Sequence, residues 1–218
     1  MQIENDPGLF ECIYNMRAMR RLKADPIPQE IIEKILDAAI RAPSGQNTQR
    51  WAFVVLTQEQ DRKFFGDNYR KWFHKLMGDN APAAQDNSKP ARQMKAALHL
   101  ADHMHEAPLI ILACGKRDWP FIVPAEERIG LAPPSYGSIY PAVQNLLLAC
   151  RGLGLGASLT TVHQMFQEEM YNYFDIPEEY GVVASIPIGY PLGNFGPVRR
   201  APLTEKVHYG RWNQREPS

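Results

Sequence analysis

The stretch Ala42-Pro43-Ser44-Gly45-Gln46-Asn47-Thr48-Gln49-Arg50-Trp51 lies between a pattern typical of a helix and a pattern typical of a strand. It is rich in small and amide side chains, and it contains a proline and a glycine. Loops of this kind, held between two rigid elements, often carry binding groups. An ordinary helix-to-strand connection has the same composition. The rest of the chain must therefore decide between the two interpretations.

The elements on either side of this loop are the clearest in the sequence. Residues 28–41 predict a helix with a broad apolar face, formed by Ile31, Ile35 and Ala39 beside Ile32, Leu36 and Ile40. Residues 51–56 form a continuous apolar run of strand length, which indicates a strand buried on both faces.

Hydrophobic periodicity predicts further helices over 7–19, 57–77, 91–105, 139–153 and 163–173, and further strands over 109–114, 157–161 and 181–189. Helix 57–77 is unusually aromatic, which fits core packing, a lid or a dimer surface. Residues 78–90 predict a mobile loop, and 118–135, with four prolines, an irregular segment. Because strands alternate with helical stretches, we predict a layered α/β arrangement in one domain, residues 1–218. Residues 190–218 lack periodicity and are either disordered or an arm packed elsewhere.

Composition excludes several classes of protein. The 218 residues include 24 Lys and Arg against 24 Asp and Glu, so no general field attracts nucleic acid or an acidic membrane. Any anion site must be local. The three scattered cysteines form no C-x-x-C motif, which favours a reducing compartment, and we expect a cytoplasmic protein. Residues 1–10 lack a signal-peptide pattern, and the longest apolar run is too short to span a bilayer.

Three motifs suggest chemistry that their context does not support. Gly152, Gly154 and Gly156 follow a helix, whereas a dinucleotide fingerprint follows a strand, so a glycine-rich helix end is the better interpretation. His99 and His103 share a helix face, but no zincin signature accompanies them. Ser44 lacks the G-x-S-x-G elbow, and no cysteine has a histidine near it in sequence. We therefore predict no nucleophile and no metal ligand.

The arginines fit a phosphate site. Arg17, Arg20 and Arg21 lie within five residues of one another, and Arg199 and Arg200 follow the last predicted strand. Singly, each is typical of a solvated surface. Together, two guanidinium groups suit a phosphate, while the Ser, Gly and Asn of the loop suit the polar edge of a ring.

These segments resemble the nitroreductase family of FMN-dependent enzymes. The residues that carry the resemblance are 16–20 (MRAMR), 26–28 (PIP), 36–51 (LDAAIRAPSGQNTQRW), 140–149 with 152–154, 188–191 (IGYP) and 199–203 (RRAPL). The similarity covers nearly the whole chain in order and is weakest over 58–87 and 118–135.

The resemblance implies an α+β fold: a three-layer α/β/α arrangement around a central mixed sheet, in an intertwined homodimer whose C-terminal arms, about 190–218, are exchanged. It also implies one FMN at each end of the dimer interface, NADH or NADPH as reductant, and ping-pong turnover. By position, the FMN-binding residues are Arg17, Ala18 and Arg20 along the phosphate, ribityl chain and pyrimidine edge; Pro43, Ser44, Gly45 and Asn47 at the isoalloxazine; Leu159, Thr160 and Thr161 on its other side; Arg199 and Arg200 at the phosphate; and Gln144.

Two departures from the family pattern matter. Met16 and Ala18 stand where the family often has Arg and Ser, so a phosphate contact and a hydroxyl contact are lost or supplied by Arg21. Arg50 replaces the proline of the family's Gln-Pro-Trp. Arg20 is the predicted cation beside flavin N1 and O2.

The acceptor is left open by the sequence. Residues 66–90 and 118–135 are expected to line a pocket for a small planar acceptor: a nitroaromatic, a quinone, an enone or free flavin. Relatives that break down flavin, remove halogens or bind flavin without NAD(P)H turnover are alternatives, as is an interaction protein without a cofactor.

Overall fold

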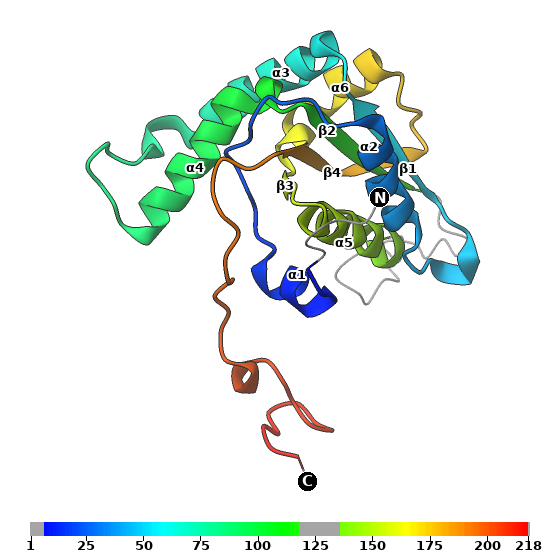
Figure 1. Ribbon diagram of the computed structural model, residues 1–218, viewed down its shortest axis with the longest axis vertical. Coiled ribbons are helices and arrows are strands. Elements are labelled where there is room, and N and C mark those ends of the chain that lie inside the picture. Colours follow the sequence, from blue (N-terminus) through cyan, green and yellow to red (C-terminus); the bar gives the residue numbers. More distant parts are fainter. Residues whose placement is uncertain (1–6, 118–135, 218) are drawn as a thin grey trace, which may run out of the picture.

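The computed structural model describes residues 7–117 and 136–217, in which six α-helices pack around a four-stranded sheet (Figure 1). The strands, in the order β1-β2-β4-β3, are β1 (Trp51–Leu56), β2 (Leu109–Lys116), β4 (Tyr180–Gly189) and β3 (Gly156–Ala157). All three pairings are antiparallel. The α+β class is confirmed, whereas the predicted mixed sheet is wrong for the described residues.

The connection between β1 and β2 explains the antiparallel pairing. It contains α3 (Glu59–Met77) and α4 (Lys89–His103), which pack against each other. A single crossover helix would return the chain for a parallel strand. Two packed helices instead run out and back, so β2 enters the sheet at the end where β1 leaves it.

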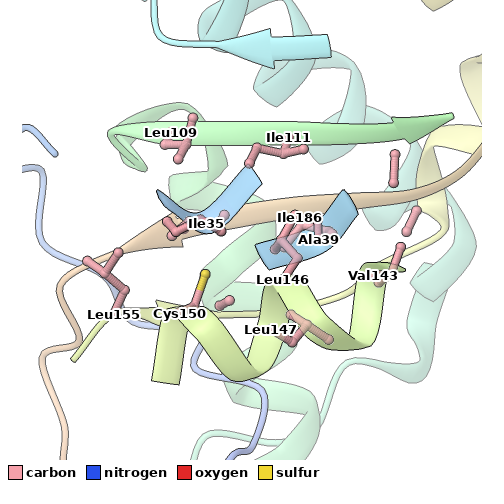
Figure 2. Packing of buried hydrophobic residues seen from close by; sticks show 14 of the residues in the cluster. Ile35, Ala39, Leu109, Ile111, Val143, Leu146, Leu147, Cys150, Leu155 and Ile186 are labelled. Carbon is pink, nitrogen blue, oxygen red and sulfur yellow. The ribbon is translucent and has the colours of Figure 1, made fainter. Parts of the chain in front are cut away.

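The helices cover both faces of the sheet, because β2 alternates its side chains between two cores. Leu109 and Ile111 face the core formed with α2 (Gln29–Ile40) and α5 (Tyr136–Gly152), which Figure 2 shows. Ile110 and Leu112 face the core formed with α3, α4 and α6 (Gln167–Phe174). Burial of each such side chain contributes about 1.5–3 kcal/mol, so the apolar run at 109–114 fixes β2 at the centre of three layers.

Other predicted elements differ at their ends. Strand β1 has the predicted bounds, but its first five residues are only half-buried because β1 lies at the edge of the sheet. Helix α1 (Leu9–Asn15) ends four residues earlier than predicted, since the backbone is extended at Met16 (φ −70°, ψ 123°). The predicted helix 163–173 begins as a 3-10 turn, Val162–Phe166, before α6.

The glycine-rich stretch after α5 is a helix end, as predicted. Gly154 has a φ of +76°, and the Leu155 N–H donates to the Cys150 carbonyl at 2.7 Å. Beyond β4, the chain runs away from the body as a largely extended segment that includes a short 3-10 helix, Leu203–Glu205 (Figure 1). The irregular segment expected at 118–135 lies outside the described residues. Within those residues, no helix combines the length and apolar character needed to cross a membrane.

Candidate active site

Two segments from opposite ends of the sequence form one wall of the candidate site. The segment after α1 is extended and lies beside the segment after β4: the Lys23 N–H donates to the Tyr190 carbonyl at 2.8 Å, and the Leu192 N–H donates to the Arg21 carbonyl at 3.0 Å. Arg17 Nη2 also donates to the Asn194 carbonyl at 2.9 Å, across 177 residues of sequence. Backbone pairing therefore positions the first arginine group beside the region that leads to the second.

A glycine in β3 allows this wall to approach the sheet. The Met19 N–H donates to the Ala157 carbonyl at 3.0 Å. A Cβ on the neighbouring Gly156 would lie 2.8 Å from the Met19 Cβ and 3.0 Å from a Leu22 methyl. Only glycine fits there, so Gly156 helps to set the position of the residues on both sides of Met19.

The wall encloses a cavity of about 530 Å³ against the first two turns of α4. Six cationic side chains line this cationic cavity: Arg17, Arg20, Arg21, Lys89, Arg92 and Arg200. No carboxylate is among its described lining residues, and none of the six forms an ion pair with another described residue. Like charges so close together repel, so the arrangement is suited to an anionic ligand.

A smaller hollow of about 120 Å³ shares Arg20 with the cationic cavity. Its lining also includes Tyr69 and Phe73 from α3 together with Leu159 and Thr160. The Tyr69 hydroxyl and Thr160 Oγ1 are 2.9 Å apart, and burial raises the pKa of Tyr69, so this hydroxyl keeps its proton at neutral pH. A charged cavity thus adjoins a hollow with aromatic and hydroxyl groups.

A buried polar cluster fixes the backbone of Thr160. Thr160 and Ser185 exchange backbone hydrogen bonds at 3.0 and 2.9 Å. The fully buried His163 lies 3.3 Å from Ser185 Oγ through Nδ1 and 3.0 Å from the Val182 carbonyl through Nε2. Burial lowers the pKa of His163, so the ring is neutral and acts as a structural hydrogen-bonding group.

The structure brings six of the sequence-predicted site residues together. Arg17, Ala18, Arg20 and Arg200 line the cationic cavity, and Leu159 and Thr160 line the adjoining hollow. Arg199 and Thr161 are exposed and are not among the described residues that line either space. Met16 stands where the family often has an arginine. Arg21 lines the cationic cavity and supplies a positive charge there.

The remaining predicted residues lie elsewhere in the chain: Pro43, Ser44, Gly45, Asn47 and Gln144. The loop packs on the beginning of α5, where the Gly45 N–H donates to Ser138 Oγ at 3.3 Å, and Gln144 is exposed on the same helix. In Figure 1, the segment between α2 and β1 lies at one side of the molecule and α4 at the other. A single chain therefore does not unite the loop with the cationic cavity.

The loop itself has an unusual backbone. Gln46, Asn47 and Gln49 have φ values of 52°, 54° and 49°, in the left-handed region that side chains other than glycine rarely adopt. Ser44 Oγ accepts a hydrogen bond from the Gln49 N–H at 3.0 Å, which closes the turn. Clustered residues of this kind are typical of ligand-binding loops.

Sequence reasoning missed Lys89 and Arg92, and it placed the aromatic row of α3 only in general terms. Phe65 and Tyr69 are core residues, but Tyr69 and Phe73 also line the hollow. Residues 66–77, expected in a pocket-lining loop, belong to α3, and Gly66 is packed against His105. The following loop is anchored, because Lys95 Nζ donates to the carbonyls of Ala84 and Asp86 at 2.6 and 2.7 Å.

The histidine pair and the cysteines Cys114 and Cys150 are not among the described residues that line either space. The rings of His99 and His103 stack 4.0 Å apart, but no group of three or more His, Cys, Asp and Glu residues there could hold a metal ion. Burial raises the pKa of the Cys114 thiol to about 12, and it also raises the pKa of Cys150. Neither cysteine is a thiolate at neutral pH.

Comparison with known proteins identifies the family. The model of the nitroreductase family matches residues 13–190. The chain belongs to the nitroreductase family. It is 27% identical over 216 residues to the 5,6-dimethylbenzimidazole synthase of Rhodospirillum rubrum, covering 96% of this chain and 91% of that protein.

Solved structures share the fold. An iodotyrosine deiodinase bound to FMN and 3-iodo-L-tyrosine superposes with a TM-score of 0.70 at 22% identity, covering 95% of this chain and all of the other. A nitroreductase with bound FMN from Desulfitobacterium hafniense has a TM-score of 0.66 at 20% identity, covering 96% and 100%.

Proposed function

We propose that the protein is an FMN-dependent oxidoreductase that passes reducing equivalents from NAD(P)H to a small planar acceptor. The observation that carries the proposal is the cationic cavity, in which Arg17 and Arg200 meet from opposite ends of the sequence. A phosphate monoester carries about two negative charges, which two guanidinium groups match in both charge and geometry. The adjoining hollow offers aromatic and hydroxyl groups to a ring.

FMN bound in these two spaces would supply the redox chemistry, which is hydride transfer from NAD(P)H and electron transfer to the acceptor. Arg20 is the residue that links the two spaces. We assign it to the pyrimidine edge of the ring, where its fixed positive charge stabilises the negative charge that reduction creates. The hydroxyl groups of Tyr69 and Thr160 lie 2.9 Å apart and both residues line the hollow, where backbone bonds to Ser185 hold Thr160 in place.

A homodimer reconciles the two separated sets of predicted residues. Helix α1 exposes 65% of Leu9 and 66% of Phe10, and Trp212 in the extended segment is 81% exposed. Exposed apolar side chains of this size favour contact with a second subunit. In our proposal, the 43–47 loop and Gln144 of one subunit close the ring site of the other. Exchange of the C-terminal arm and a single domain over 1–218 are parts of the same proposal.

A second candidate activity is that of the 5,6-dimethylbenzimidazole synthase, which is favoured by 27% identity over 96% of the chain. The two candidates differ in the fate of the flavin. An oxidoreductase returns its FMN unchanged after each turnover, so chromatography of the flavin after exhaustive NAD(P)H oxidation in air distinguishes them. Loss of FMN in proportion to NAD(P)H consumed favours the second candidate.

The test of the main proposal is the visible spectrum of the purified protein with added FMN. We expect a bound-flavin spectrum that bleaches with NADPH or NADH without air and returns when a quinone or a nitroaromatic is added. An Arg17→Ala/Arg200→Ala variant should lose FMN, whereas Lys34→Met, which removes one exposed charge on α2, should retain it. A protein that binds no FMN refutes the proposal, and one that binds FMN without bleaching is a flavin-binding protein only.

A further inference from the structure

The cationic cavity carries more positive charge than FMN requires. The FMN phosphate brings about two negative charges, whereas six cationic side chains line the cavity. Arg17 and Arg200 are assigned to that phosphate, and Arg20 to the ring. Lys89, Arg92 and Arg21 are left without an anionic partner among the described residues.

The surplus positive charge is concentrated on one face of α4. Lys89 and Arg92 are three residues apart, so they lie on the same face of the helix, and both line the cavity. Lys89 makes no hydrogen bond with another described residue, while Arg92 uses one donor on the Asn87 carbonyl and keeps the others. Ala96, one turn further along, and Gly193 on the facing segment are small and leave space beside these charges.

We propose that Lys89 and Arg92 bind the 2′-phosphate of NADPH, so that the enzyme prefers NADPH to NADH. The inference rests on the proposed function and names its reductant. A 2′-phosphate monoester is the group that distinguishes the two dinucleotides, and it carries about two charges, which one Lys and one Arg match. Arg21 adds to the positive electrostatic potential in the same cavity.

The test compares FMN-loaded wild type, a Lys89→Met/Arg92→Gln variant, and the Lys34→Met control. We expect kcat/KM for NADPH to exceed that for NADH by about tenfold or more in wild type, a range typical of a charge-assisted phosphate contact. The ratio should fall toward one in the double variant, through KM for NADPH, and stay at the wild-type value in the control.

A binding measurement removes the dependence on turnover. Calorimetry with adenosine 2′,5′-bisphosphate and adenosine 5′-monophosphate compares two unreactive probes that differ by the 2′-phosphate. Wild type should bind the bisphosphate about tenfold more tightly, and the double variant should not discriminate.

Equal affinity for the two probes in wild type, or discrimination that persists in the double variant, overturns the inference. The inference is also overturned if NADH and NADPH reduce the enzyme equally well and free FMN is a better electron acceptor than riboflavin. In that case the surplus positive charge binds the phosphate of a second flavin. This result differs from a failure of the proposed function, in which the protein would bind no FMN at all.

Discussion

Gly156→Ala tests whether the close approach of the first arginine segment to the sheet creates the site. The new methyl group would lie 2.8 Å from the Met19 Cβ, about 1 Å inside ordinary contact, and 3.2 Å from the Pro191 Cβ. The Met19 Cβ is attached to the backbone, so relief requires the segment that carries Arg17 and Arg20 to move. Forced overpacking of this kind costs about 1–3 kcal/mol of folding stability.

The same movement should weaken FMN binding. Charge-assisted hydrogen bonds contribute about 1.5–3 kcal/mol each, so misplacing one arginine raises the Kd for FMN at least about tenfold. The assay is titration of apoprotein with FMN, followed by flavin fluorescence, together with urea unfolding. Gly152→Ala is the matched control, because its new methyl group would meet only Cys12 Sγ, at an ordinary 3.8 Å. If Gly156→Ala matches wild type in both measurements, the reasoning is wrong.

Three further predictions concern Arg20, His163 and the two cysteines Cys114 and Cys150. Arg20→Ala should raise the Kd for FMN about 10- to 100-fold and make the bound flavin harder to reduce, and an unchanged Kd and midpoint potential would remove Arg20 from the ring site. Burial lowers the pKa of His163, so the unfolded chain binds its proton first and stability should fall as the pH drops below about 6.5, by up to about 1.4 kcal/mol per pH unit from this group. Urea midpoints between pH 7.5 and 5.5 measure this slope, which His163→Gln should flatten. Because burial raises the pKa values of Cys114 and Cys150, a thiol reagent at pH 8 should modify them only after denaturant is added, and rapid labelling of the folded protein would contradict their burial.

The parts of the fold that follow from local pattern were predictable. Strand β1 has the bounds expected from its apolar run, and β4 begins one residue before the expected Gly181. Strand direction was not predictable in the same way. It depends on how α3 and α4 pack together and return the chain, and periodicity carries no information about that packing.

The lining of the cationic cavity was predictable where residues close in sequence stay close in space. Arg17, Ala18 and Arg20 share one extended segment, and the backbone bonds at Tyr190 and Leu192 bring the second arginine region to it. Lys89 and Arg92 carried no local signal, because only the packing of α4 places them in the cavity. The separation of the 43–47 loop from that cavity likewise depends on tertiary structure, and its proposed role stays a prediction until a dimer is measured.

If the hydrogen bonds that join residues 17–23 to residues 190–194 build the proposed phosphate site, they also set when that site can form during synthesis. A nascent chain on the ribosome can form the sheet through β4 while Arg200 is still inside the exit tunnel. Until Arg200 emerges, one of the two arginines that we assign to the phosphate is missing from the cationic cavity. In the proposed function, flavin therefore binds only after Arg200 has left the tunnel, and when it does, it holds residues 17–23 and the segment that leads to Arg200 together. Cells short of flavin should accumulate the apoprotein with these two segments frayed, where a protease would cut first.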